Sequence, residues 1–227
     1  MSARPSPLRA VVFDLDGTLI DSRRDIAEAA NYALERAGFA RLSHDELSSY
    51  VGDGATALMA CAARLDINDG RTAALVASFL DYYADHAIDF TQPMPGALAA
   101  LDALSGYGLG ICTNKPRRTM LAVLRGLQLE PRFGSLVAGD DLEQRKPHPA
   151  MVLESARLLG VSADSVVMVG DGPQDVLAGK AAGAFTIGVH GGIIDAERLL
   201  RAEPHMMLGS LHELPAALSE LARDKPR

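Results

Sequence analysis

The sequence contains short, continuous apolar runs, and most of them end at polar residues. The first is the A-V-V-F run of Ala10–Phe13, which ends at Asp14. Such a run is typical of a strand that is buried on both faces of a parallel sheet. The same pattern predicts further strands over residues 109–113, 135–138, 165–169, 185–189 and, at a sheet edge, 205–208.

Between these runs, apolar residues recur at the spacing of a helix face. The segments with this spacing are residues 95–107, 116–127, 149–159 and 173–182, and each begins at a proline. Proline suits the first turn of a helix, because the N–H group that it lacks would have no helical partner there. Strands that alternate with helices predict an α/β fold with a doubly wound parallel sheet.

The stretch from residue 22 to residue 90 follows a different pattern. It contains no convincing strand, and its apolar positions predict four helices over residues 23–37, 43–50, 55–65 and 71–86. We therefore expect an all-helical subdomain formed by residues 22–90. It would be inserted after the first strand of an α/β core formed by residues 1–21 and 91–227.

Composition and charge narrow the range of functions. A chain of 227 residues is long enough for one α/β domain with a small insert. Its 48% hydrophobic and 22% charged residues are ordinary for a globular protein and exclude wholesale disorder. The formal charge of −7 provides no general attraction to nucleic acid or to an anionic membrane surface. We expect neither as a partner.

Two further features bear on the compartment. No apolar run precedes the first strand, and none approaches the roughly 20 residues that a membrane span requires. Cys61 and Cys112 show no metal-binding or redox spacing, so we interpret them as buried thiols in a reducing compartment. The expected protein is soluble and cytoplasmic, as a monomer or a homodimer.

Polar residues gather where four of the predicted strands end. The carboxyl ends of parallel strands meet at one edge of a sheet, and ligands bind beyond that edge. The residues that the fold would bring to this rim are Asp14, Asp16, Thr113, Asn114, Lys115, Lys146, Asp171 and Asp175.

These residue types together indicate phosphate chemistry. Carboxylates crowded into one site repel each other unless a cation joins them, and oxygen ligands favour Mg²⁺. Lysine and hydroxyl groups suit the oxygens of a phosphate. A carboxylate beside that phosphate can attack it and form an acyl phosphate. A second carboxyl two residues later can protonate the leaving oxygen and then activate water.

The same residues carry a family resemblance. The D-L-D-G-T-L segment at residues 14–19 resembles the opening motif of the haloacid dehalogenase superfamily. The pairs T-N at residues 113–114, K-P at residues 146–147 and G-D at residues 170–171, with Asp175, are similar to the later motifs of that family and follow its order. The helical insert after the first motif is similar to the family's subgroup with a helical cap.

This resemblance implies roles for the residues that would react with or bind the phosphate. Asp14 would be the nucleophile, and Asp16 would be the general acid and base. Thr113 and the backbone of Asn114 would bind the phosphate, and Lys146 would neutralise both the nucleophile and the phosphate.

The resemblance also implies a magnesium site. Asp14, Asp171 and the backbone carbonyl of Asp16 would bind Mg²⁺, and Asp175 would support the ion directly or through its other ligands. One departure from the family pattern is Gly172, which stands where many relatives have serine. It removes a side-chain hydrogen bond but no carboxylate.

Within the family, the chain resembles phosphoglycolate phosphatases. The resemblance lies in the Y-V-G-D-G-A loop at residues 50–55, in the T-N-K-P run at residues 113–116 and in Gly172. It implies hydrolysis of 2-phosphoglycolate to glycolate and phosphate. It also makes Asp53 and Gly54 candidates for substrate binding, with an N-cap role as the alternative for Asp53.

Other functions remain open at this stage. The substrate can instead be pyrophosphate or a sugar phosphate, or the reaction can be a phosphosugar mutase reaction. Carbon–halogen hydrolysis would need neither Asp16 nor a metal, and a non-catalytic binding protein could share the fold. The G-D-G-A-T-A segment at residues 52–57 matches a dinucleotide pattern, but no clear strand precedes it, which disfavours a nucleotide cofactor.

Overall fold

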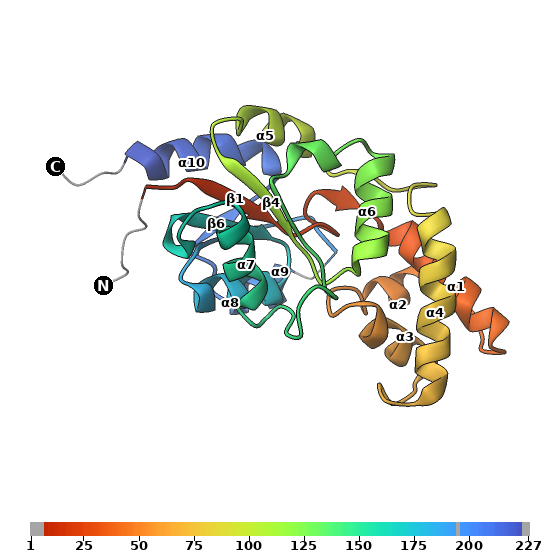
Figure 1. Cartoon of the computed structure of the whole chain (residues 1–227). Helices are drawn as coiled ribbons and strands as arrows, with labels where there is room; N and C mark the ends of the chain where they lie inside the picture. Colours follow the sequence, from red (N-terminus) through yellow and green to blue (C-terminus); the bar gives the residue numbers. More distant parts are fainter. Residues whose placement is uncertain (1–6, 194–195, 224–227) are drawn as a thin grey trace.

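The computed structural model describes residues 7–193 and 196–223. In this part of the chain the main sheet has six parallel strands in the order β5-β4-β1-β6-β7-β8 (Figure 1). The strands are β1 Ala10–Phe13, β4 Gly108–Cys112, β5 Ser135–Val137, β6 Val166–Gly170, β7 Phe185–Val189 and β8 Met206–Leu208. The predicted parallel sheet is therefore confirmed. Residues 1–6 and 224–227, the outer ends of the predicted core, lie outside the described residues.

The central strand β1 is buried on both faces. Val11 and Phe13 point into a large apolar cluster on one side of the sheet. Ala10 and Val12 point into a second cluster on the other side. Because successive side chains of a strand alternate between faces, only a continuous apolar run can fill both clusters.

Helices cover both faces of the sheet. Helices α5 and α10 lie over one face, and α7 and α8 lie over the other, while α6 lies beside the helical insert (Figure 1). The bounds of the helices in the core are α5 Ala97–Ala103, α6 Arg117–Gly126, α7 Ala150–Leu158, α8 Pro173–Ala182, α9 Ala196–Arg201 and α10 Leu214–Arg223. Three single-turn 3₁₀ helices occur at Glu130–Arg132, Ala163–Ser165 and Leu211–Glu213.

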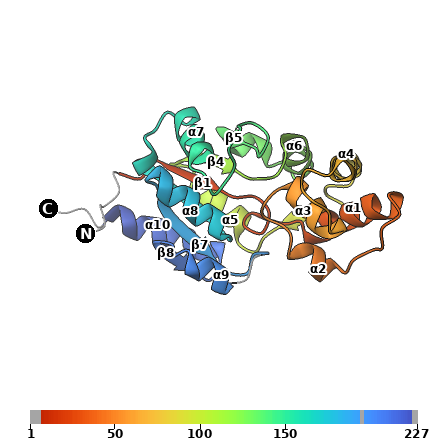
Figure 2. The same ribbon diagram turned by 90° about the horizontal axis from the view of Figure 1, so that it is seen from below.

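Four helices follow the first strand and gather at one end of the molecule, away from α7, α8 and α10 (Figure 2). They are α1 Arg23–Arg36, α2 His44–Ser48, α3 Ala55–Ala63 and α4 Gly70–Asp85. A short antiparallel ribbon of β2 Ile20–Asp21 and β3 Gln92–Pro93 links this segment to the core. The two connections thus enter and leave the helical segment side by side.

The predicted helix over residues 95–107 is shorter in the structure, where α5 spans only Ala97–Ala103. Gly96 precedes it with a φ of 83°, in the left-handed region. A right-handed helix cannot continue through that backbone conformation, so Pro95 lies outside the helix. Of the four predicted proline starts, only Pro173 is the first residue of its helix.

Within residues 7–193 and 196–223, no helix is both long enough and apolar enough to cross a membrane. The prediction that both thiols are buried holds for Cys112 and is wrong for Cys61, which lies on the exposed side of α3. Burial raises the pKa of the Cys112 thiol to about 12.

Candidate functional site

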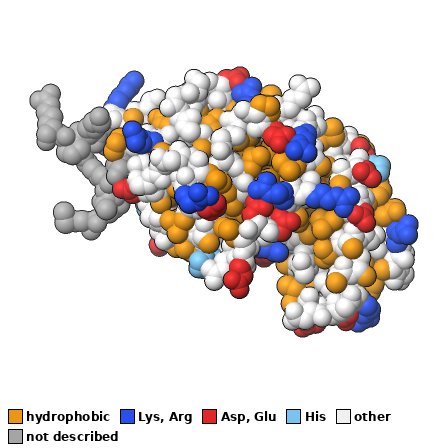
Figure 3. Space-filling view, in the orientation of Figure 1, with side chains coloured by type: hydrophobic (Ala, Val, Ile, Leu, Met, Phe, Trp, Pro, Cys, Tyr) orange, Lys and Arg blue, Asp and Glu red, His pale blue; other side chains and the backbone are white. Residues whose placement is uncertain are grey.

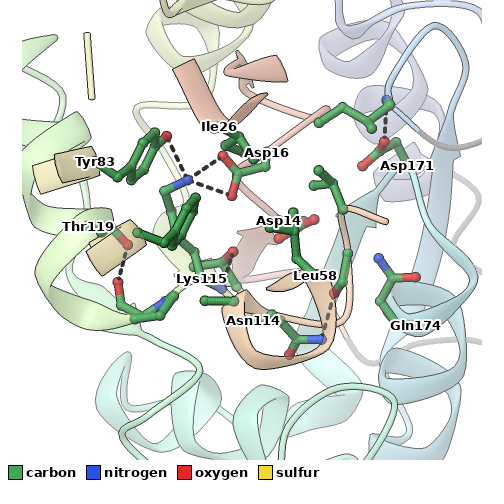
Figure 4. Close-up of a pocket in the computed structure, with 18 residues that line it drawn as sticks. Asp14, Asp16, Ile26, Leu58, Tyr83, Asn114, Lys115, Thr119, Asp171 and Gln174 are labelled. Atoms are coloured by element: carbon green, nitrogen blue, oxygen red, sulfur yellow. Dashed lines mark hydrogen bonds and ion pairs between the residues drawn. The ribbon is translucent and has the colours of Figure 1, made fainter. Parts of the chain in front are cut away.

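A pocket lies between the carboxyl edge of the sheet and the helical segment (Figure 4). Its polar side chains come from the core, among them Asp14, Asp16, Thr113, Asn114, Lys115, Asp171 and Gln174. Most of its apolar wall comes from the helical segment, through Ile26, Val51, Leu58, Phe79 and the ring of Tyr83. The pocket therefore combines a polar floor with an apolar roof.

A buried lysine holds two of the aspartates. Lys146 Nζ lies 2.8 Å from Asp14 Oδ1 and 2.6 Å from Asp175 Oδ1. The side chain of Lys146 is 1% exposed, so its ammonium group is shielded from solvent. The backbone N–H of Asp14 donates to Val169 O at 2.9 Å. This hydrogen bond holds Asp14 beside the end of β6, the strand that leads to Asp171.

The electrostatics of this cluster follow from its burial. Burial alone disfavours the charge of Lys146, but the carboxylates of Asp14 and Asp175 raise its pKa, so it stays cationic. Burial raises the pKa of Asp175 well above its ordinary value, an effect that Lys146 opposes and that the charges of Asp14 and Asp171 reinforce. The single ammonium group of Lys146 is therefore not enough to stabilise the negative charge of every carboxylate in this cluster, as expected for carboxylates that share a site.

Three buried carboxylates could hold a metal ion. Asp14, Asp171 and Asp175 each offer one oxygen, and these oxygens lie within 4.8 Å of one another. Thr18 Oγ1 donates to Asp171 Oδ1 at 3.0 Å, and the backbone N–H of Ile193 donates to Oδ2 at 2.8 Å. The Asp171 carboxylate is therefore fixed in orientation. The side chain of Asp16 is not part of this group and points to Lys115 instead (Figure 4).

Glycine makes room for these carboxylates. Gly17 has a φ of 86°, and a Cβ atom added there would lie 2.3 Å from Asp171 Oδ2. A Cβ atom on Gly170 would lie 2.2 Å from Asp175 Oδ2. No real Cβ atom approaches an oxygen so closely. The close packing of the acidic site therefore requires glycine at positions 17 and 170, in the D-x-D-G and G-D sequences.

Asp16 is bound to a second buried lysine. Lys115 Nζ donates to Asp16 Oδ1 at 2.8 Å and to Oδ2 at 3.1 Å, and Ser22 Oγ donates to Oδ1 at 2.5 Å. Lys115 Nζ also donates to the hydroxyl of Tyr83 at 2.9 Å and lies 4.4 Å from the centre of its ring. Burial lowers the pKa of Lys115, but Asp16 more than offsets this and raises it overall. Burial raises the pKa of Tyr83 to about 12.

Thr113 and Asn114 lie at the end of β4. Both are buried, and Thr113 Oγ1 accepts a hydrogen bond from the backbone N–H of Lys115 at 3.2 Å. Asn114 Oδ1 accepts from the backbone N–H of Lys146 at 3.1 Å. Asn114 Nδ2 donates to the backbone carbonyls of Lys146 at 3.0 Å and of Gly52 at 2.9 Å. The Asn114 side chain thus ties the Lys146 loop to the loop between α2 and α3.

That loop holds the two remaining candidates. Gly54 lines the pocket and is the N-cap residue of α3, with a φ of 89°. Asp53 is exposed and does not line the pocket, and its proposed N-cap role is wrong, because Gly54 takes that position. The backbone of this loop therefore faces the pocket while the Asp53 side chain points to solvent.

The sequence assigned no catalytic role to Lys115 or Tyr83, yet Lys115 contacts Asp16 and Tyr83 contacts Lys115. Lys115 was predicted at the rim of the sheet and belongs to the T-N-K-P run, but neither signal indicated a partner for it. Tyr83 lies on the same face of α4 as Leu75 and Phe79, all three buried, so its position predicts only a core residue. Its contact with a lysine 32 residues away depends on how the helical segment packs on the core.

The fold and the pocket together define an α/β protein with a buried carboxylate and lysine site at the carboxyl edge of its sheet. Residues 11–189 match the family model of haloacid dehalogenase-like hydrolases. The chain belongs to this family, and the predicted resemblance is confirmed.

Curated relatives share most of their length with this chain. It is 42% identical over 184 residues to the phosphoglycolate phosphatase of Rhodospirillum rubrum, a match that covers 77% of this chain and 76% of the relative. It is 36% identical over 223 residues to that of Neisseria meningitidis, with 94% and 95% covered. Among solved structures, a predicted phosphoglycolate phosphatase from Haemophilus somnus has a TM-score of 0.86 at 24% identity, with 93% and 98% covered. The last comparison supports the fold.

Proposed function

We propose that this chain is a Mg²⁺-dependent phosphomonoesterase that hydrolyses 2-phosphoglycolate to glycolate and phosphate through an aspartyl phosphate. The observation that carries the proposal is the position of Asp14. Its carboxylate lies in a buried group with Asp171, Asp175 and Lys146, and it faces a pocket that the helical segment covers. A carboxylate that is fixed, desolvated and open to a pocket suits nucleophilic attack.

The proposed reaction uses two carboxyl groups in sequence. Asp14 attacks the phosphorus while Asp16 gives its proton to the leaving glycolate oxygen, so that an acyl phosphate and glycolate result. Asp16 then takes a proton from water, the water oxygen attacks the phosphorus, and phosphate leaves as the Asp14 carboxylate re-forms. Thr113, the backbone of Asn114 and Lys146 bind the phosphate oxygens throughout.

The acidic group suits a magnesium ion. Asp14, Asp171 and Asp175 provide only oxygen ligands, close together and buried, and Asp16 would add its backbone carbonyl. When bound, the ion neutralises the carboxylates and draws negative charge from the phosphate. Asp175 would reach it directly or hold Lys146 and the other ligands in place.

We propose further that residues 22–90 act as a cap on a core formed by residues 1–21 and 91–227. Most of the apolar lining of the pocket comes from this segment and would exclude water from the acyl phosphate. Gly54 and the neighbouring backbone would limit the size of the leaving group. Asp53, which is exposed, would reach the substrate only if this loop moves.

A small metabolite is the best partner for such a site. The pocket is roofed, which disfavours phosphoproteins and nucleic acid. The net charge of −7 is spread over a surface where acidic and basic side chains alternate on the visible face (Figure 3). We propose that the enzyme acts in the cytoplasm as a monomer or a homodimer. The relatives named phosphoglycolate phosphatase support this particular substrate.

The test of this function is a panel of phosphorylated metabolites. With Mg²⁺ present, 2-phosphoglycolate should give the highest kcat/KM, at least about tenfold above pyrophosphate and sugar phosphates, since each fitted group is worth about 1–3 kcal/mol. Phosphate release is the measurement. A sugar phosphate at the top of the ranking would overturn the substrate but not the reaction. A requirement for an activating bisphosphate with little free phosphate would indicate a mutase.

Removal of divalent metal should stop this reaction. We expect EDTA to lower phosphate release on the order of 100-fold, and Mg²⁺ to restore it, because a bound metal contributes several kcal/mol of charge stabilisation. Added Mg²⁺ should also raise the Tm of the wild-type chain, since binding to the folded state alone stabilises it. Full activity in EDTA would contradict the metal proposal and would favour metal-free chemistry such as carbon–halogen hydrolysis.

A further inference from the structure

The leaving group of the proposed substrate carries its own charge. In 2-phosphoglycolate a carboxylate is attached to the carbon next to the ester oxygen. This anion must enter a pocket whose roof is apolar and whose floor is rich in carboxylates. Burial of an unpaired charge is costly, so selective binding requires a cation near the ester oxygen.

Lys115 is the candidate for that cation. Among the described residues that line the pocket, it is the one with a cationic side chain. The ammonium group of Lys146 pairs with Asp14 and Asp175, at the phosphate end of the proposed substrate, and is therefore not the cation for the leaving group. The Lys115 side chain is 5% exposed and lines the pocket, and its ammonium group contacts both Asp16 and Tyr83 (Figure 4).

The position of Lys115 matches the connectivity of the substrate. Asp16 must reach the ester oxygen to protonate it, and Lys115 Nζ lies 2.8 Å from Asp16 Oδ1. A carboxylate one carbon away from that oxygen therefore falls beside the lysine. The phosphate, at the other end of the molecule, falls beside Asp14.

We propose that Lys115 determines specificity by binding the carboxylate of the leaving group. The inference rests on the proposed function and adds a residue to it. Nζ has three N–H bonds, and in this structure it uses them on the two oxygens of Asp16 and on Tyr83. One of the two bonds to Asp16 can pass to the substrate while the other two contacts persist.

Tyr83 links this recognition to the helical segment. Its hydroxyl comes from α4 and accepts a hydrogen bond from the same ammonium group that binds Asp16 (Figure 4). Without that contact, Nζ would lose one of the two groups that fix its position. Tyr83 is thus a positioning residue, and the carboxylate site is complete only when α4 packs against the core.

The experiment compares two substrates that differ only in this carboxylate. Ethyl phosphate has a methyl group where 2-phosphoglycolate has the carboxylate. In Lys115→Met, the ratio of kcat/KM for 2-phosphoglycolate to that for ethyl phosphate should fall about 100-fold, as for loss of one partner of a buried charge pair. The ratio isolates recognition, because any effect through Asp16 slows both substrates alike.

Tyr83→Phe serves as the second variant and keeps the ring in place. It should lower the same ratio about fivefold, as for one lost hydrogen bond, and it tests the inference even if Lys115→Met does not fold. Equal losses on both substrates in these variants would show that Lys115 acts only through Asp16, which would overturn the inference and leave the proposed function intact. A wild-type enzyme without preference for 2-phosphoglycolate over ethyl phosphate would overturn the substrate proposal as well.

Discussion

Replacement of Asp14 by Asn should lower phosphate release by a factor on the order of 10⁴ or more, the scale on which loss of a covalent nucleophile acts. The amide has the shape of the carboxylate, and its oxygen can still accept from Lys146, which lies 2.8 Å from Asp14 Oδ1. It lacks the negative charge that attacks phosphorus. The measurement is steady-state phosphate release from 2-phosphoglycolate with saturating Mg²⁺.

The matched control is Asp85→Asn, at the exposed end of α4. It changes the same functional group and should leave kcat/KM unchanged. Wild-type enzyme quenched during turnover should carry phosphate on residue 14 that hydroxylamine removes, and the variant should carry none. Turnover by Asp14→Asn within a few-fold of the wild-type rate would mean that another group attacks the phosphate.

The strands could be predicted from the sequence because a continuous apolar run is stable only where both of its faces are buried. A run such as A-V-V-F must be buried on both sides, and β1 is. The topology then brings the ends of β1, β4 and β6 together, so Asp14, Thr113 and Asp171 meet even though they are far apart in the chain. The order of the motifs, and the rule that parallel strands end at one edge of the sheet, were sufficient to predict which polar residues form the floor of the pocket.

Contacts between the two parts of the chain were beyond prediction. Tyr83 looks like a core residue on α4, and only the packing of α4 on the core brings its hydroxyl to Lys115. The burial of Lys146 was equally hidden, because a lysine beside a proline is compatible with an exposed turn. Asp53 was assigned by resemblance of a loop, and loop resemblance does not fix which side chains face inward.

Short or marginal elements were missed for a different reason. The ribbon of β2 and β3 has two residues in each strand, too few for a periodic pattern. Helix α10 was not predicted, although it buries Leu214, Ala217 and Leu218 at helical spacing. The core helices begin at residues other than those predicted where the backbone of a glycine or proline determines the first turn, as Gly96 does before α5.

Replacement of Lys146 by Met should destabilise the fold and impair catalysis together. Asp14 and Asp175 would lose the ammonium group that lies 2.8 and 2.6 Å from them. Removal of one partner from a buried ion pair costs about 3–5 kcal/mol of unfolding free energy. Turnover should fall on the order of 10³-fold, since a buried cation that neutralises phosphate is lost as well. Chemical denaturation and phosphate release measure the two effects. The control Lys180→Met removes a partly exposed lysine of α8 that donates to two backbone carbonyls, so it should leave turnover unchanged and cost less stability than Lys146→Met.

The combination of Lys146→Met with Asp175→Asn separates charge balance from packing. If the cost of the single variant comes from carboxylates left without a counter-ion, removal of one carboxylate must return part of the lost stability. The double variant should then be more stable than Lys146→Met by about 1–3 kcal/mol, although it carries one more substitution. Additive losses in the two variants would instead mean that the lysine stem, and not its charge, supports the site. Activity should not return in the double variant, because stability needs only a balanced buried charge, whereas phosphate binding needs the cation itself.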